Sequence, residues 1–208
     1  PYNAIQIEEI LAQRTQLAFN ENVVDPVVLS YCASRAAQEH GDARKALDLL
    51  RISAELAERD EREIVTVNYV TKAQDVMEKD QVRSIISTLP IHYKATLASA
   101  ILNQGKRENG NQTTGEVYST YTQICKRFNL TDLTQRRIGY IINELDMQGL
   151  INAKIVSLGR QGRTRFISVA IDETQVKELF KEDSFLTDIM DELTKTGNYI
   201  GSTQMRLI

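Results

Sequence analysis

The spacing of apolar residues changes near Gly149, and that change limits the folds open to this chain. Before Gly149, apolar side chains recur every three or four residues, which is typical of amphipathic helices. After it, residues 151–158 and 165–171 alternate or run apolar with many β-branched side chains, which is typical of strands. The intervening residues 159–162, GRQG, predict a hairpin tip. We therefore expect a mainly helical chain with one late β-hairpin.

The N-terminal part predicts a small helical bundle. Apolar periodicity indicates helices at residues 3–19, 27–39, 43–60 and 67–80. Pro26 suits the first turn of the second helix, Asp42 the N-cap of the third, and Thr66 a cap of the fourth. Four short helices with tight connections are typical of a bundle.

The middle of the chain predicts a different unit. Helices are expected at residues 82–89, 91–104 and 116–128, with one long polar loop at 105–115. A further helix is expected to be capped at Thr131 or Asp132 and to end at Gly149. Helix, helix, helix, hairpin is the order of a winged helix-turn-helix domain. Helices at 173–182 and 184–193 follow, so the expected organisation is 1–80, 81–182 and 183–208.

The charges are segregated along the chain, although the net charge is only -3. Residues 1–80 carry 9 Lys and Arg against 15 Asp and Glu, and residues 171–208 carry 4 against 8. Residues 81–170 carry 12 against 5. A basic segment between two acidic ones predicts a polyanionic partner for that segment.

Other classes of function have little support in the sequence. Cys32 and Cys125 lie far apart without a CxxC pattern, so two reduced thiols and no metal site are expected. His40 and His92 fall in different predicted units, so no catalytic group is expected; we expect His40 at a helix end and His92 in surface or interdomain packing. The start, PYNAIQIEEIL, lacks the pattern of a secretory signal and an initiator Met, which favours an intracellular fragment. No apolar run approaches the length of a membrane span.

The helix before Gly149 has a face suited to reading DNA. Its apolar positions, spaced as i, i+3, i+4 and i+7, are Ile138, Ile141, Ile142 and Leu145. The opposite side carries residue types that contact base edges and phosphates. The side chains expected to contact DNA are Gln135, Arg136, Arg137, Tyr140 and Asn143. Gly139, on the flank of this face, costs the helix about 1 kcal/mol relative to Ala, which a close approach to DNA would explain.

The hairpin tip carries several arginines beside glycines. In the winged fold such a hairpin projects beside the recognition helix, where guanidinium groups bind phosphates or enter a narrow minor groove. The expected contacts on the hairpin are Arg160, Arg163, Thr164 and Arg165, joined by Lys126 and Arg127 before the helix-turn-helix turn. A solvated face, or an acidic protein partner, remains an alternative reading of the same charges.

Several segments together resemble a known family. HGDARKALDLLR is similar to the sensor-2 segment of AAA+ ATPases. It is followed by LPIHYKATLASAIL, GEVYSTYTQIC, RRIGYIINELDMQGLI and GRQGRTRFISV. This order resembles archaeal replication initiators of the Orc/Cdc type over residues 1–182.

The resemblance implies a AAA+ lid followed by a winged-helix domain. Arg44 matches the sensor-2 arginine that reaches the γ-phosphate of ATP, and Tyr2 matches a position near adenine. ATP or ADP with Mg²⁺ would be bound by the full-length parent. No GxxxxGK[ST] loop occurs in the sequence, so we expect no cofactor and no ATPase activity for this chain alone.

The resemblance also implies partners and a location. These are double-stranded DNA at a replication origin, the replicative helicase that the initiator helps to load, and other initiator copies, in a cytoplasmic, nucleoid-associated setting without a membrane. Two other readings stay open: a winged-helix transcription regulator with a dimerising or sensing bundle, and a winged helix that docks a protein.

Overall fold

The computed structural model describes residues 1–104, 111–157 and 163–195, and within this part the backbone contacts divide into two compact units. The first unit is Pro1–Gln81 and the second is Val82–Ile208. The chain is mainly helical with one small sheet, as expected.

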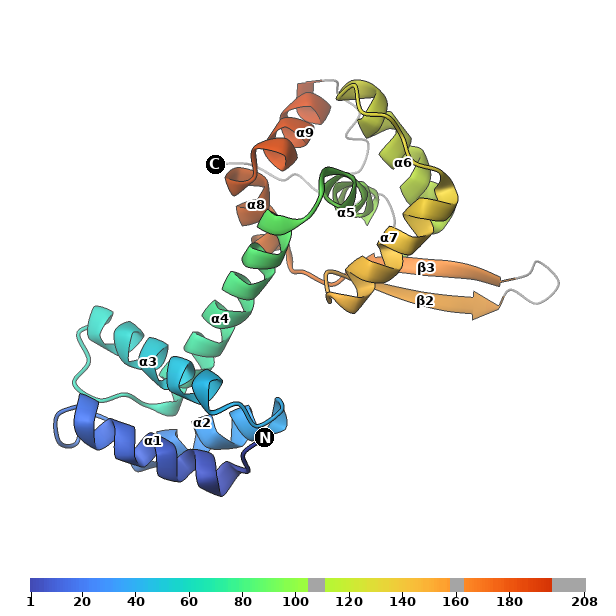
Figure 1. Ribbon diagram of the computed structural model, residues 1–208. Helices are drawn as coiled ribbons and strands as arrows, with labels where there is room; N and C mark the ends of the chain where they lie inside the picture. The colour runs from blue at the N-terminus through green and yellow to red at the C-terminus, as the bar shows by residue number, and fades with distance from the viewer. Residues whose placement is uncertain (105–110, 158–162, 196–208) are drawn as a thin grey trace. The chain divides into compact units, whose positions relative to one another are not determined.

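Four helices build the first unit (Figure 1). They are α1 (Ala4–Ala18), α2 (Pro26–Gln38), α3 (Ala43–Arg59) and the part of α4 (Val67–Thr88) that ends at Gln81. Their starts follow local chemistry: Asn3 forms a capping box with Gln6, and the carboxylates of Asp25 and Asp42 accept from backbone N–H groups of α2 and α3. Asp42 therefore occupies the capping position expected of it.

A single apolar core holds these four helices together. Its fully buried side chains come from every helix and include Ile7, Leu11, Val28, Cys32, Ala46 and Val70. A parallel bridge between Val24 and Val65 links the two connecting segments that precede α2 and α4. Burial raises the pKa of the Cys32 thiol to about 12, so this group stays protonated. Cys32 and Cys125 are both buried and free, as predicted.

Helix α4 corrects the prediction of two helices at residues 67–80 and 82–89. The structure has one helix, Val67–Thr88. This segment contains neither glycine nor proline, so nothing in its backbone chemistry ends the helix at residue 80. Pro90 is the first residue that does, because it disfavours the helical conformation of the residue before it.

The second unit has the element order helix, strand, helix, helix, strand, strand (Figure 1). These are α5 (Ile91–Gln104), β1 (Gln112–Thr113), α6 (Thr114–Arg127), α7 (Gln135–Met147), β2 (Ile151–Ser157) and β3 (Arg163–Val169). Gly149 has a φ of 73° and ends α7 as expected. The hairpin of β2 and β3 extends beyond the helices of this unit (Figure 1).

The sheet has the order β1-β3-β2, with both pairs antiparallel. Strand β1 was missed by the prediction of a loop through residue 115, because two residues are too few to show a period. Its polar residue Gln112 is buried and donates from Nε2 to the backbone oxygen of Ala100 at 2.7 Å. Strand β3 begins at Arg163, two residues earlier than predicted, where Arg163 pairs with Ser157.

The starts of α6 and α7 also differ from prediction. Helix α6 begins at Thr114, because Thr113 and Glu116 form a capping box. Helix α7 begins at Gln135 with Thr134 as its N-cap, instead of Thr131 or Asp132.

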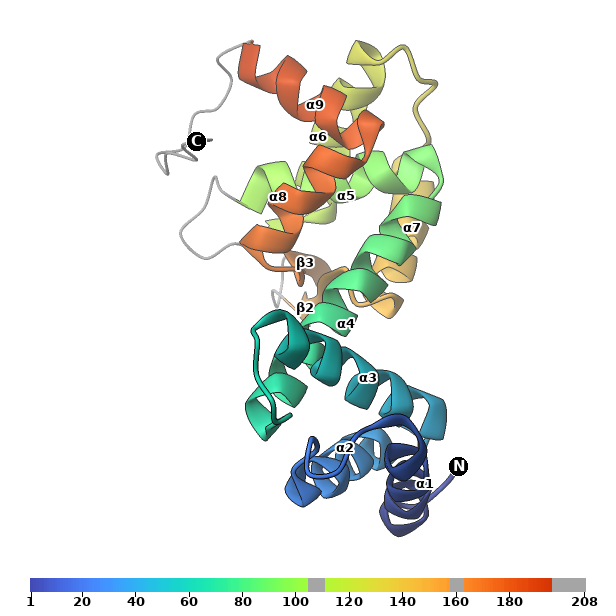
Figure 2. The ribbon, with the colours of Figure 1, turned by 90° about the vertical axis from the view of Figure 1, so that its left-hand side faces the viewer.

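Two more helices, α8 (Glu173–Glu182) and α9 (Ser184–Lys195), complete the second unit. They pack on each other, and α9 packs on α5 (Figure 2). Phe128 and Phe185 meet edge to face with ring centroids 5.4 Å apart. Lys94 of α5 forms a largely buried ion pair with Asp183, which lies between α8 and α9. No helix in the described residues has both the length and the apolar character to cross a membrane.

Candidate nucleic-acid interface

The turn between α6 and α7 is held by one buried tyrosine. The Tyr121 hydroxyl accepts a hydrogen bond from the backbone N–H of Leu133 at 3.0 Å and lies 2.8 Å from His92 Nδ1. Burial raises the pKa of Tyr121 well above its usual value, so the hydroxyl keeps its proton. Residues 131–133 are thus held in the turn, which explains why α7 begins only at Gln135.

The two histidines lie in different units. Surface or interdomain packing was expected for His92; the structure leaves His92 partly exposed and packs it against Tyr121 of its own unit. His40 follows α2 with a φ of 84°, in agreement with a helix-end role.

Helix α7 has the two faces that its sequence predicts. Ile138, Ile141, Ile142 and Leu145 are buried. On the opposite side, a stripe at positions i, i+4, i+7 and i+11 is exposed: Arg136, Tyr140, Asn143 and Met147. Gln135 is exposed at the first position of the helix.

Within this stripe, Arg136 and Tyr140 are neighbours. The Arg136 guanidinium donates from Nη2 to the Tyr140 hydroxyl at 3.4 Å. Met147 was not singled out from the sequence, yet its side chain is 82% exposed on the same stripe. The stripe offers one cation, one amide and two large side chains, which together suit base edges and phosphates.

Arg137 lies on a different flank of α7. It is exposed but is rotated about 100° around the helix from Arg136. A hydrogen bond to Glu144 raises the pKa of Tyr93, and the charge of Arg137 opposes that rise. Arg137 is therefore close to the Tyr93 and Glu144 pair and does not belong to the exposed stripe.

Arg165 joins the hairpin to α7. Its Nη1 donates to the backbone oxygen of Gly139 at 3.1 Å. A Cβ built on Gly139 would meet no atom of the chain within 4 Å, so the side of the helix at this residue is open. The structure thus brings Arg165 together with the Gly139 flank of α7, as the winged arrangement requires.

No contact with α7 is described for the other predicted hairpin residues. Thr164 pairs with Val156 and is adjacent to Arg165 in β3, so the two side chains point to opposite faces of the sheet. Arg163 is a strand residue paired with Ser157. Arg160 lies outside the described residues.

Lys126 and Arg127 occupy the last turn of α6, and both are exposed. Cations at this position also favour the helix electrostatically, because the C-terminal end of a helix carries partial negative charge. These residues therefore have a structural role in addition to the predicted contact with phosphates.

The residues expected near a nucleotide lie in the first unit. The Tyr2 backbone N–H donates to the Gly41 oxygen at 3.0 Å, so the start of the chain rests on the turn before α3. Gly41 has a φ of 69°, and a Cβ there would lie 2.3 Å from the Tyr2 oxygen. The Tyr2 side chain is half exposed.

Arg44 is exposed near the start of α3. Within the described residues Arg44 forms no ion pair with Asp42 or Asp48, and Asp48 pairs instead with Arg51 at 3.6 Å. The Asp42 carboxylate accepts from the Arg44 backbone N–H at 2.8 Å. Because Asp42 caps this helix end, any anion held here would be held by the Arg44 side chain.

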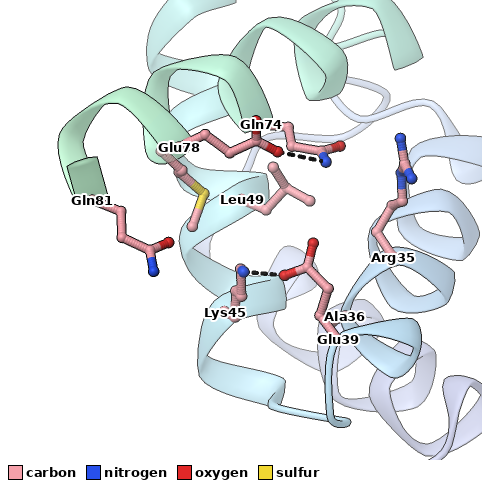
Figure 3. A pocket seen from close by; sticks show the side chains of 9 residues that line it. Arg35, Ala36, Glu39, Lys45, Leu49, Gln74, Glu78 and Gln81 are labelled. Carbon is pink, nitrogen blue, oxygen red and sulfur yellow. Dashed lines mark hydrogen bonds and ion pairs between the residues drawn. The ribbon is translucent and has the colours of Figure 1, made fainter. Parts of the chain in front are cut away.

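A small pocket of about 70 Å³ lies among α2, α3 and α4 (Figure 3). Two polar atoms at its wall, Arg35 Nε and Gln74 Oε1, are buried without a partner in the described residues. An ion pair of Lys45 with Glu39 lines the pocket as well. The volume is far below the several hundred Å³ of sites that hold nucleotide-sized ligands. Neither Arg44 nor Tyr2 lines this pocket, so it is separate from the expected nucleotide contacts.

The second unit, with its helix-turn-helix, three-stranded sheet and cationic hairpin, is a winged-helix domain, and a four-helix bundle precedes it in the chain. Residues 84–179 match the family model of the CDC6 C-terminal winged helix domain. Residues 8–75 match the family model of the Cdc6 AAA+ ATPase-type lid domain. The chain belongs to the archaeal ORC1/Cdc6 family of AAA+ replication proteins, of which it carries the lid and winged-helix parts.

Relatives support this assignment over most of the chain. It is 47% identical over 182 residues to an ORC1-type DNA replication protein 1 of Sulfolobus acidocaldarius, covering 88% of this chain and 45% of the relative. It is 47% identical over 192 residues to an ORC1-type DNA replication protein of Thermococcus onnurineus, covering 91% and 46%. The chain spans about half the length of the curated relatives it matches.

A solved structure agrees with the fold. The Aeropyrum pernix ORC1 protein, determined in complex with DNA, is 41% identical and superimposes with a TM-score of 0.78. The match covers 91% of this chain and 49% of that protein.

Proposed function

We propose that this chain binds double-stranded DNA at a replication origin through the exposed stripe of α7 and the β2–β3 hairpin. The single observation that carries the proposal is the hydrogen bond from Arg165 to Gly139, which fixes a cationic strand beside the recognition helix. One duplex then meets Arg136 and Arg165 on a common surface. The DNA-bound ORC1 relative adds support, since it shares this fold.

Each element has its own task in this proposal. The α7 stripe enters the major groove, where Arg136 contacts guanine or phosphate and Asn143 contacts adenine. The hairpin holds the adjacent groove or backbone, with Arg165 donating to phosphates through the N–H groups that Gly139 leaves free. Lys126, Arg127 and Arg137 lie at the flanks of the helix-turn-helix and add electrostatic attraction.

For the full-length protein we propose an ATP-regulated initiator that helps to load the replicative helicase and acts with other initiator copies in the cytoplasm, at the nucleoid. Exposed Arg44 fits a contact with a terminal phosphate, and Tyr2 lies on the turn that precedes it. The four-helix bundle would act as the lid that senses whether ATP is bound. The task of Arg44 is to donate to that phosphate, and the task of Gly41 is to seat the Tyr2 backbone.

The test is a titration of this chain on a candidate origin duplex and on a random duplex of equal length, at two salt concentrations. For a protein that binds DNA phosphates, log K falls linearly with the logarithm of the salt concentration, with a slope of about -0.9 for each phosphate contacted. We expect a steep slope on both duplexes and tighter binding to the origin.

The variant Arg136→Ala makes this test specific to the recognition helix. Removal of the Arg136 guanidinium should reduce the preference for the origin duplex over the random duplex, by about 1–3 kcal/mol where the contact is bidentate to guanine. Arg14→Ala on α1 removes an equal charge from the first unit and serves as the control. Unchanged discrimination by Arg136→Ala would show that the recognition face is misassigned.

A further inference from the structure

One face of strand β2 changes from buried to exposed along its length. Ile151 is 1% exposed, Ala153 is partly buried, and Ile155 is 67% exposed. Alternate residues of a strand share a face, so these three side chains form one row. The apolar cover over this row therefore ends at Ile155.

Ile155 lies directly beside the residue that joins the hairpin to α7. It is the cross-strand partner of Arg165, and side chains of such partners stand on the same face about 4.5–5.5 Å apart at Cβ. Arg165 in turn donates to Gly139, whose side of α7 is open. Ile155 is thus an exposed apolar group next to the inner corner of the hairpin and the recognition helix.

The chemistry around Ile155 matches the cross-section of a DNA groove. Charged phosphates form the rims of a groove, whereas sugar C–H groups and base edges form its interior. Arg165 supplies a cation beside Ile155 on the same face of the hairpin, whereas the exposed Lys154 lies on the opposite face. An apolar side chain next to a cation is suited to the interior of a groove, while the cation reaches the rim.

We propose that Ile155 packs against the apolar sugar and base-edge surface of the groove that the hairpin enters, while Arg165 beside it contacts phosphate. The inference rests on the proposed function and adds a contact that is independent of charge. Apolar contact stabilises by about 25 cal/mol per Å² removed from water. It contributes no release of counterions, so it leaves the salt slope unchanged.

Salt titrations of Ile155→Ala and Ile155→Lys test the proposal. Ile155→Ala should bind five- to tenfold more weakly at every salt concentration, about the loss expected when one to two CH2-sized groups lose their apolar contact, with the wild-type slope. Ile155→Lys should also bind more weakly, although it adds a positive charge. Leu17→Lys, at a position 79% exposed on α1, adds the same charge outside the interface and is the control.

The outcomes separate this inference from the proposed function. Tighter or equal binding by Ile155→Lys, with a slope steeper by about 0.9, would show that the position faces phosphate and would overturn the inference. Equal binding by Ile155→Ala would overturn it as well. Ile155→Thr keeps a β-branched side chain suited to a strand, so its weaker binding would exclude a folding artefact. If wild type itself bound DNA without a salt slope, the proposed function would fail first.

Discussion

Arg165 Nη1 donates to the backbone oxygen of Gly139 across 26 residues of sequence, at 3.1 Å. This bond connects β3 to the middle of α7, so the hairpin and α7 are coupled by a side chain that also carries charge. A guanidinium has five N–H donors, which leaves several for a second partner.

Replacing both Arg163 and Arg165 with alanine should weaken binding to every duplex sequence. Removing one bond to a phosphate should flatten the plot of log K against log salt by about 0.9, so up to about 1.8 is expected for the pair. Arg14→Ala with Arg62→Ala, two exposed positions in the first unit, removes the same charge elsewhere. A double variant with the wild-type slope would contradict the hairpin assignment.

Gly139→Ala should separate stability from binding. Because a Cβ at residue 139 meets no atom within 4 Å, alanine should stabilise the helix by about 0.5–1 kcal/mol, measured by urea denaturation. The same methyl group should weaken DNA binding where a backbone approaches the helix closely. A variant that is more stable and binds equally well would show that DNA does not approach Gly139.

Tyr121→Phe should destabilise the second unit by about 1 kcal/mol, since it leaves the partly buried N–H of Leu133 without its acceptor. The measurement is equilibrium unfolding followed by circular dichroism. Tyr118→Phe, on the neighbouring partly buried ring, is the matched control. Equal destabilisation by the two variants would argue against a special role for the Tyr121 hydroxyl.

Gly41→Ala should destabilise the first unit. The φ of 69° costs a residue with a Cβ about 1–2 kcal/mol, and the clash with the Tyr2 oxygen adds to this. Gly41→Asn tolerates the backbone angle better but keeps the clash, so a comparison of the two unfolding free energies separates the two effects. A destabilisation by Gly41→Ala below about 0.5 kcal/mol would mean that the contact with Tyr2 does not persist in solution.

Local chemistry made much of the fold predictable. The apolar period identified the buried residues Ile138, Ile141, Ile142 and Leu145, and capping chemistry identified Asp42. Features set by partners distant in sequence were missed. Strand β1 exists because β3 lies beside it, and the late start of α7 depends on a hydroxyl from α6.

The candidate site was predictable in residue type more than in arrangement. Periodicity placed Arg136, Tyr140 and Asn143 on one exposed stripe. The prediction grouped Arg137 with them, although its position, about 100° around the helix from Arg136, already separates it from the stripe. The alternation of side chains along β2 places Ile155 on the same face as Ile151. The exposure of Ile155 depends on where the apolar side chains that bury this face end, which the alternation does not show.

The hydroxyl of Tyr121 ties the turn before α7 to the interior of its own unit. For the DNA binding that we propose, a helix anchored in this way is preorganised, so little conformational entropy would be lost when the duplex is bound. The rate of association is then governed by diffusion and by long-range attraction between cations and the polyanion.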